Sequence, residues 1–261
     1  MKKPLLDVIF ASEKRKNVLL LLQDGPQGME ILLKSLDTTR QSLLPQVRIL
    51  EEHHLVDHYD DTYELTTIGK LIIDEMKPLL YTIKVFDKDI DYWGNHDLSY
   101  IPPHFLQRID ELRECRAIKP SITDLYEIDE EFHEASKRSE SHSVITTYIH
   151  PEFYRLVYEM MNNNVQMYFV FPPDLLDQLQ PARYAELIEV SKSEFVHIFV
   201  YPKKVGFLFF AFNDTHSMLS LTTNNGKFDG RYLLCRYKKS LEWEKDLFDY
   251  YLKESTPINE I

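Results

Sequence analysis

The chain has 261 residues, 44% of them apolar and 13% aromatic, with only 7 glycines and a formal net charge of −12 at pH 7. This length and composition favour two domains with buried cores and exclude a disordered or fibrous protein. The longest uninterrupted apolar run, Val205 to Phe212, is far too short to cross a bilayer, and the N-terminus carries no signal-peptide pattern. We therefore expect a soluble, cytoplasmic protein without a membrane partner.

Three helical patterns follow one another near the N-terminus. Ser12 is placed to cap a helix over residues 12–23, and a Gly-Pro stop signal ends it. A second helix is predicted over 29–36 and a third over 40–53, each with apolar residues on one face. Pro45 lies inside the third helix and should kink it or tighten its start, because proline removes one helical hydrogen bond.

Two short strands, 55–59 and 62–66, are predicted next around the acidic turn Asp60-Asp61. With "LDTTRQSLLPQVRILEEHHLV" ending at Val56 and "YELTTIGK" at 63–70, this region resembles the winged helix-turn-helix family of prokaryotic transcription regulators, most closely its arsenic-repressor-type group. The resemblance covers about residues 5–80. It implies that double-stranded DNA is a partner and that the third helix enters the major groove.

A long helix is predicted from Thr67 onward, with apolar residues at spacings of three and four that approach a heptad repeat. Such a stripe is typical of a helix that pairs with a second copy, and Pro78 should kink it. The predicted dimerisation residues are Ile72, Met76, Leu79, Ile83, Phe86 and Ile90. We accordingly place the winged-helix domain at 1–67, a linker and dimerisation helix at 68–100, and a third region at 101–261.

The remaining chain alternates between strand and helix patterns. Helices are expected over 103–112, 123–138, 151–162 and 173–190, and strands over 144–149, 165–171, 195–200, 205–212, 218–223 and 232–237. Helices between the first three strands predict parallel crossovers, whereas polar turns at 201–204 and 224–226 predict hairpins. Ser240 is the expected cap of a last helix. The predicted fold is a two-domain α+β or α/β protein, with a mixed C-terminal sheet and flanking helices.

This C-terminal region also carries a resemblance. "HPEFYRLVYEMMNNNVQMYFVFPPDLL" and "GRYLLCRYKKSLEWEKDLFDYY" are similar to archaeal, methanogen-type regulators that join an arsenic-repressor-like N-terminal domain to a Fil-type middle or sensor domain. The resemblance implies a dimeric regulator of methanogen metabolism whose effector is generally undefined. We expect a small-molecule effector that the C-terminal domain senses. The candidate effector-binding residues are Tyr168, Phe171, Thr222, Thr223 and Arg231. For each aromatic residue, ordinary core packing is the stronger alternative.

The net charge argues against nucleic acid as a partner, but the local charge decides this question. Residues 34–48 hold Lys34, Arg40 and Arg48 against the single Asp37. The predicted DNA contacts are Thr38, Thr39, Arg40, Gln41, Ser42 and Gln46 around the third helix, together with Lys34, Arg48, Lys14, Arg15 and Lys16. The acidic turn at 60–61 should be repelled by phosphate. The alternative function is a winged-helix adaptor that contacts protein without sequence-specific DNA binding.

No catalytic or metal motif is visible in the sequence. Phosphate-binding loops and nucleophile signatures are missing, so we expect no enzyme, no catalytic residue and no cofactor. The ten histidines do not converge at metal-ligand spacing, so no metal site is predicted. Cys115 and Cys235 are far apart in sequence, and we expect no disulfide, although one long-range bridge stays open. We interpret Cys115 as an ordinary partly buried cysteine in preference to an oxidant-sensing thiol.

Overall fold

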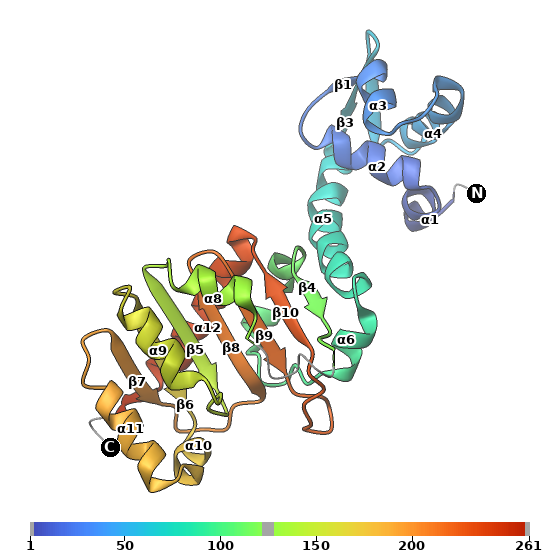
Figure 1. Cartoon of the computed structure of the whole chain (residues 1–261). Helices are drawn as coiled ribbons and strands as arrows, with labels where there is room; N and C mark the ends of the chain where they lie inside the picture. The colour runs from blue at the N-terminus through green and yellow to red at the C-terminus, as the bar shows by residue number, and fades with distance from the viewer. Residues whose placement is uncertain (1–2, 122–127, 259–261) are drawn as a thin grey trace. The chain divides into compact units, whose positions relative to one another are not determined.

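The computed structural model describes residues 3–121 and 128–258. By its internal contacts the chain divides into two compact units, Met1–Tyr81 and Thr82–Ile261, and each contains both helices and strands (Figure 1). The division falls inside one helix. In the described part of the chain, no helix has the length and apolar character that a membrane span requires. The functional boundaries expected at residues 67 and 100 stay predictions.

The N-terminal unit combines short helices with a three-stranded antiparallel sheet. Its elements are α1 (Leu5–Phe10), α2 (Glu13–Leu22), β1 (Gln27–Gly28), α3 (Met29–Ser35), α4 (Arg40–Glu52), β2 (Val56–Tyr59), β3 (Thr62–Leu65) and the greater part of α5 (Thr67–Asp87). The strand order is β1-β3-β2. The three predicted helices and the hairpin are thus confirmed to within one residue, as is the Ser12 cap, which accepts a hydrogen bond from the amide of Arg15. β1 and α1 were not anticipated.

One apolar face of each helix forms the core of this unit. On α4, Leu43, Val47 and Leu50 are completely buried, and their spacing of four and three residues is that of a single helical face. Pro45 lies on the opposite, exposed face. α4 therefore continues past Pro45 to Glu52 as one helix, and the missing amide donor falls on its solvent side.

The C-terminal unit is built on an eight-stranded mixed sheet. Its helices are α6 (Ile90–Asn95), α7 (Pro103–Leu106), the 3₁₀ helix η1 (Ile109–Leu112), α8 (Glu130–Ser136), α9 (Phe153–Met161), α10 (Pro173–Gln178), α11 (Pro181–Val190) and α12 (Lys238–Lys253). Its strands are β4 (Arg116–Ile118), β5 (Ser141–Thr146), β6 (Gln166–Phe171), β7 (Val196–Val200), β8 (Phe207–Asn213), β9 (Ser217–Leu221), β10 (Tyr232–Cys235) and β11 (Thr256–Pro257). The order is β11-β7-β6-β5-β8-β9-β10-β4.

Two of the seven strand pairings in the described part of this sheet are parallel, and the other five, including the β11–β7 pairing at one edge, are antiparallel. β5, β6 and β7 pair in parallel, which confirms the predicted crossovers, whereas β8, β9, β10 and β4 pair antiparallel. The hairpin predicted at 201–204 is wrong, because β8 does not pair with β7. Instead β8 pairs with the edge of β5 that faces away from β6. α8 and α9 lie on one face of the sheet and α12 on the other (Figure 1).

Several predicted helix boundaries need correction. The helix expected to continue to Ile90 ends at Asp87, because Asp89 caps a new helix by accepting a hydrogen bond from the amide of Tyr92. The helix expected over 173–190 is divided at Pro181, which begins α11. The pattern at 103–112 forms two short helices. Of the helix expected over 123–138, α8 is observed, and residues 122–127 lie outside the described part.

Two local details also differ from expectation. Ser240 does not cap α12, which begins two residues earlier; its buried hydroxyl donates to the Glu111 carbonyl at 2.8 Å. In β8 the regular two-residue alternation of side chains breaks at an irregularity between Phe207 and Phe209. Phe207 consequently shares a core with Phe210, which regular alternation would place on the opposite face of the sheet.

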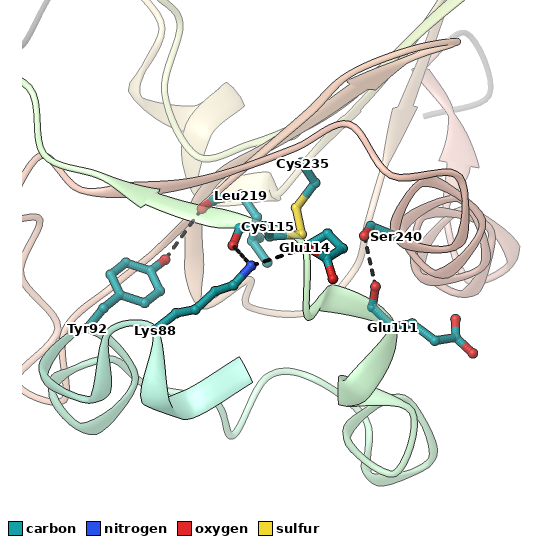
Figure 2. Close-up of a disulfide and its surroundings, with 8 residues drawn as sticks. All are labelled: Lys88, Tyr92, Glu111, Glu114, Cys115, Leu219, Cys235 and Ser240. Carbon is teal, nitrogen blue, oxygen red and sulfur yellow. Dashed lines mark hydrogen bonds and ion pairs between the residues drawn. A yellow bond between two sulfur atoms is a disulfide. The ribbon is translucent and has the colours of Figure 1, made fainter. Parts of the chain in front are cut away.

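The expectation for the two cysteines was wrong: Cys115 and Cys235 form a disulfide (Figure 2). Arg116 pairs with Leu234 in the antiparallel β4–β10 ladder, so Cys115, which precedes Arg116, lies opposite Cys235, which follows Leu234. The two Cα atoms are 4.3 Å apart. Tertiary pairing therefore brings together two residues 120 positions apart. Beside the bridge, the Lys88 ammonium donates to the Cys115 carbonyl at 3.4 Å.

We expect the Glu244 carboxyl to make folding pH-dependent. Glu244 is fully buried, and burial raises its pKa to about 8, against a smaller lowering effect of the Ser217 hydroxyl. The folded chain thus keeps a proton that the unfolded chain releases near pH 4.5. The free energy of unfolding should fall as pH rises from about 5 to 8, by about 3–5 kcal/mol in total. Glu244→Gln should remove this fall.

Urea denaturation at several pH values measures this effect through tryptophan fluorescence, because Trp93 and Trp243 both belong to the C-terminal unit. Glu242→Gln, an exposed neighbour on the same helix, is the matched control and should keep the wild-type pH dependence. Equal pH dependence in wild type and Glu244→Gln would contradict the prediction.

We also expect Gly69 to be essential for the packing of the N-terminal unit. A Cβ at this position would collide with the backbone carbonyl of Leu55. Gly69→Ala should therefore lower the free energy of unfolding of this unit by about 2–3 kcal/mol. Amide hydrogen exchange of α2 and α4 measures the loss. Gly28→Ala, whose Cβ meets only an ordinary contact at 3.7 Å, is the control, and equal effects of the two changes would refute the packing argument.

Candidate functional site

The exposed face of α4 is the first candidate surface. Gln41, Pro45 and Arg48 follow one another at spacings of four and three residues, and all three are exposed. Arg40, at the start of the helix, is 61% exposed and lies 3.7 Å from a carboxylate oxygen of Asp61. The face opposite Leu43, Val47 and Leu50 therefore presents an amide and a guanidinium group, and Arg40 adds a second guanidinium at the start of the helix. These are groups that read bases and phosphates in DNA.

A second group of predicted DNA contacts lies between α2 and α4. Lys14 donates a hydrogen bond to the hydroxyl of Ser42, and Arg15 donates to the side-chain oxygen of Gln46 at 2.6 Å. Arg15 also donates to the backbone carbonyl of Val8. The structure thus brings these four predicted residues together in one polar seam. They orient α4 on α2, and their role as DNA contacts stays a prediction.

The other predicted DNA contacts surround the entry to α4. Thr39 is exposed at the cap position, and Thr38 precedes it. Lys34 is exposed in the last turn of α3. Lys16 is placed differently, because its ammonium pairs with Glu13 at 2.6 Å on the same helix. Of the two lysines in this group, Lys34 lies nearer to Thr38 and Thr39 in sequence than Lys16.

The turn between β2 and β3 is acidic and tightly folded. Asp60 and Asp61 both have left-handed backbone angles, with φ of 44° and 64°. Aspartate adopts this region more readily than most residues, which explains why two adjacent aspartates can form this two-residue turn. Asp61 is 60% exposed and is the partner of Arg40. The tip of the hairpin therefore carries negative charge beside the start of α4.

The structure distributes the predicted dimerisation residues over several environments. Met76 is buried in the N-terminal core with Ile72 packed against that core, and Phe86 packs on the core of the C-terminal unit. Leu79 and Ile83 are 52% and 40% exposed on α5. Ile90, 63% exposed, belongs to α6. Of the six predicted dimerisation residues, Leu79 and Ile83 are thus the two that are exposed on α5.

The predicted effector residues do not meet in one place. Phe171 is fully buried in the core beneath α9, and Tyr168 stacks on His197 at 4.8 Å. Thr222 and Thr223 lie at the start of the β9–β10 connection, where both hydroxyls donate to backbone carbonyls. Arg231 lies at the end of that connection.

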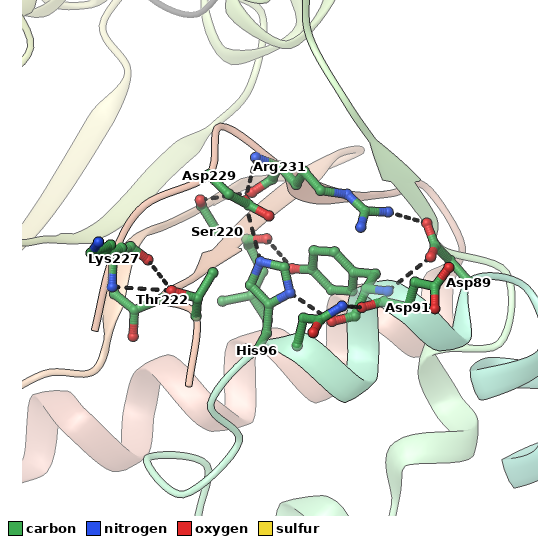
Figure 3. Close-up of polar contacts among 12 residues, drawn as sticks. Asp89, Asp91, His96, Ser220, Thr222, Lys227, Asp229 and Arg231 are labelled. Atoms are coloured by element: carbon green, nitrogen blue, oxygen red, sulfur yellow. Dashed lines mark hydrogen bonds and ion pairs between the residues drawn. The ribbon is translucent and has the colours of Figure 1, made fainter. Parts of the chain in front are cut away.

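Arg231 belongs to a polar network that joins α6 to the β9–β10 connection (Figure 3). Its guanidinium pairs with Asp89 and lies over the Tyr92 ring, 5.1 Å from the centroid. The buried His96 contacts the Tyr92 carbonyl at 2.6 Å through Nδ1 and Asp229 at 3.3 Å through Nε2. Apart from the buried Nε of Arg231, which has no hydrogen-bond partner among the described residues, these side chains pair with one another, which is the arrangement expected of a structural connection.

A cavity of about 580 Å³ lies in the C-terminal unit, and sequence reasoning missed it. It is bordered by α8, α9 and the strands from β4 to β6 and β8 to β10. Its wall includes Asp129, Phe132, His142, Val144, Thr146, Tyr148, His150, Phe153, Val157, Phe169, Phe209, Ala211, Met218, Phe228 and Tyr232. The sequence signal that could have indicated it is His142, a titratable residue two positions before the predicted strand 144–149.

One group of side chains could hold a metal among the described residues. Ligand atoms of Cys115, Cys235 and Glu244 all lie within 4.8 Å of one another and are buried. In this structure the two sulfur atoms are bonded to each other, so neither is a thiolate, the form in which cysteine binds metals. In this oxidised form the cluster consists of a disulfide bridge, which has a structural role, and the buried carboxyl group of Glu244 beside it.

Comparison with known sequences matches two families to separate parts of the chain. Residues 125–254 match the model of the middle domain of methanogenesis regulatory protein FilR1, and residues 6–88 match the HVO_A0261 N-terminal domain. The chain is 22% identical over 259 residues to "Methanogenesis regulatory protein FilR1" of Methanothrix harundinacea (strain 6Ac). The match covers 97% of this chain but only 58% of that protein.

Two solved structures are similar at low identity. TrmBL2, described as an archaeal chromatin protein with a novel mode of DNA binding, aligns with 97% of both chains at 11% identity and a TM-score of 0.41. Quinone-bound YodB from B. subtilis aligns with 28% of this chain and 85% of its own at 17% identity, with a TM-score of 0.27.

Proposed function

We propose that this chain is a DNA-binding transcription regulator that acts as a homodimer and responds to a small-molecule effector. The sequence similarity to a methanogenesis regulatory protein extends over 97% of the chain and supports a regulatory role. Since the chain spans 58% of that relative, the remainder of the relative contributes nothing to this proposal. Double-stranded DNA is the proposed partner of the N-terminal unit.

The arrangement around α4 is the observation that carries the proposal. The order α2, β1, α3, α4, β2, β3 and the β1-β3-β2 sheet support a winged helix-turn-helix domain. In such a domain we propose α4 as the recognition helix, with Gln41 and Arg48 on its exposed face. Glutamine can bind adenine and arginine can bind guanine through paired hydrogen bonds. The polar seam between α2 and α4 fixes the orientation in which α4 presents this face.

The dimer is proposed to form through the exposed part of α5. Leu79 and Ile83 are large apolar side chains one turn apart, both exposed to solvent in the single chain. Burial of such residues against a second copy is favourable. A dimer would also place two recognition helices on one duplex, which compensates for the small number of cations that each copy presents.

The acidic hairpin turn favours the alternative function, a winged-helix adaptor that binds protein. Asp61 pairs with Arg40, and the chain carries a net charge of −12. Both features weaken attraction to phosphate. A stable protein partner that copurifies without nucleic acid, combined with no specific DNA binding, would favour this alternative.

DNA binding is tested with a duplex from the region upstream of the protein's own gene, titrated by gel shift and fluorescence anisotropy at two salt concentrations. Gln41→Ala and Arg48→Ala should each weaken specific binding about tenfold, since one good base contact contributes about 1–3 kcal/mol. Asp61→Asn should strengthen binding, because it frees Arg40 and removes a negative charge. Lys192→Ala, an exposed cation of the C-terminal unit, is the control.

No specific shift at low salt with this duplex, or unchanged affinity in both α4 variants, would refute recognition through α4. A tenfold loss in Lys192→Ala would show that net charge alone governs the interaction.

Dimerisation is tested by light scattering on Ile83→Glu. A charge at this position should convert the dimer to a monomer, because it would be buried without a partner. Leu71→Glu is the matched control, since Leu71 is 65% exposed on another face of α5 and should leave the dimer intact. A wild-type protein that is monomeric at micromolar concentration, or a dimer in the Ile83→Glu variant, would contradict the proposal.

A further inference from the structure

We propose that the cavity in the C-terminal unit binds an uncharged, ring-containing small molecule with at least one hydrogen-bonding group. This inference extends the proposed function, because such a molecule would be the effector, but ligand binding itself is independent of DNA. The argument depends on four properties of the cavity: its position on the sheet, its apolar wall, its charge and its unpartnered polar groups.

The position of the cavity follows from the parallel and the antiparallel strands of the sheet. The crossover helix α9 covers the parallel strands, whereas β8, β9 and β10 follow one another along the chain without a helix between them. On this face α8 is the helix nearest to β8 (Figure 1). Val144 of β5, Ala211 of β8 and Met218 of β9 form part of the floor, and Val157 of α9 forms a side. The hollow is thus a consequence of the strand order.

The wall is mainly aromatic and aliphatic. Phe153 meets Phe169 edge to face with ring centroids 5.1 Å apart, and Phe209 lies 6.4 Å from both Tyr148 and Tyr232. Rings arranged in this way offer both faces and edges to another aromatic group. The volume of about 580 Å³ lies within the range of small-molecule sites in proteins.

The charge of the wall excludes anions. Among the described residues that line the cavity there is no lysine or arginine, and one carboxylate, that of Asp129. One oxygen of Asp129 accepts from the amide of Phe132 at 2.9 Å, and the other accepts from the Tyr232 hydroxyl at 3.2 Å. Phosphorylated or carboxylated ligands would therefore enter without a counterion, at a large desolvation cost.

Two polar side chains are left for a ligand. His142 is 7% exposed, and neither of its ring nitrogens has a hydrogen-bond partner among the described residues. Burial lowers its pKa to about 4, so the imidazole is neutral at physiological pH and offers one donor and one acceptor. Burial also raises the pKa of Tyr148, whose hydroxyl stays protonated. A hydroxyl, carbonyl, amide or amine on the ligand would satisfy these groups.

The second hollow of the same unit does not share these properties. It has a volume of about 480 Å³ and is lined by several ionic side chains, including Lys238, Lys245, Asp214 and Glu242. These charges make it a site that water fills. Tyr168, one of the predicted effector residues, lines this second hollow.

A matched pair of fluorescent probes tests the proposal on the full chain. N-phenyl-1-naphthylamine is neutral and carries two ring systems and one N–H donor, and its 8-sulfonate differs by a single negative charge. The neutral probe should bind saturably with one site per chain, and the sulfonate at least tenfold more weakly. Absence of saturable binding, or equal affinity for both probes, would overturn the proposal.

Variants locate the site. Ala211→Phe should fill the cavity and weaken binding of the neutral probe at least tenfold, and Val157→Phe fills it from the opposite wall if the first variant fails to fold by circular dichroism. Leu241→Trp, an enlargement in the second hollow, should leave the affinity within twofold. His142→Phe keeps the shape and should cost about fivefold through the lost hydrogen bond. Equal binding by the filled variants and Leu241→Trp would overturn the assignment.

The DNA titration described above, repeated with saturating neutral probe, separates this inference from the proposed function. Saturable binding of the probe to a chain that binds no DNA either with or without the probe would refute the regulator and leave the site intact. DNA binding by a chain that does not bind the probe would refute the cavity site and leave the proposed regulator intact.

Discussion

The burial of one face of α4 is the constraint on which the N-terminal unit depends. Leu43, Val47 and Leu50 are completely buried, and the removal of such side chains from water is the main favourable contribution to folding. Because a helix has a fixed rotation per residue, burying these positions forces Gln41 and Arg48 to the surface. The candidate recognition surface is therefore a by-product of core packing, and the polar seam formed by Arg15 and Gln46 fixes its orientation.

In the C-terminal unit, the strand order has a comparable effect. Parallel pairing requires crossover connections, so β5, β6 and β7 bring their own covering helix α9. Antiparallel pairing requires no crossover helix, and β8, β9 and β10 follow one another along the chain without a helix between them. A hollow at the boundary between the parallel and the antiparallel strands, lined by both, is the physical result.

The Cys115–Cys235 bridge shows how the edge of this sheet is secured. β4 has three residues and is the edge strand of the described sheet, where it pairs with β10, so its ladder is short. The disulfide adds a covalent connection directly beside this short ladder, and η1 and α12 are joined nearby through Ser240 and Glu111. The buried Glu244 carboxyl lies next to the bridge, and burial raises its pKa.

The sequence by itself determined the local elements of this protein. Hydrophobic period, capping residues and turn signals placed α2, α3, α4 and the β2–β3 hairpin, because these depend on neighbours within a few residues. The pairing of β8 with β5, the opposition of Cys115 and Cys235, and the cavity around His142 depend on residues far apart in sequence. Only the tertiary structure decided them, since pairing register and packing between distant elements leave no periodic signal in any single segment.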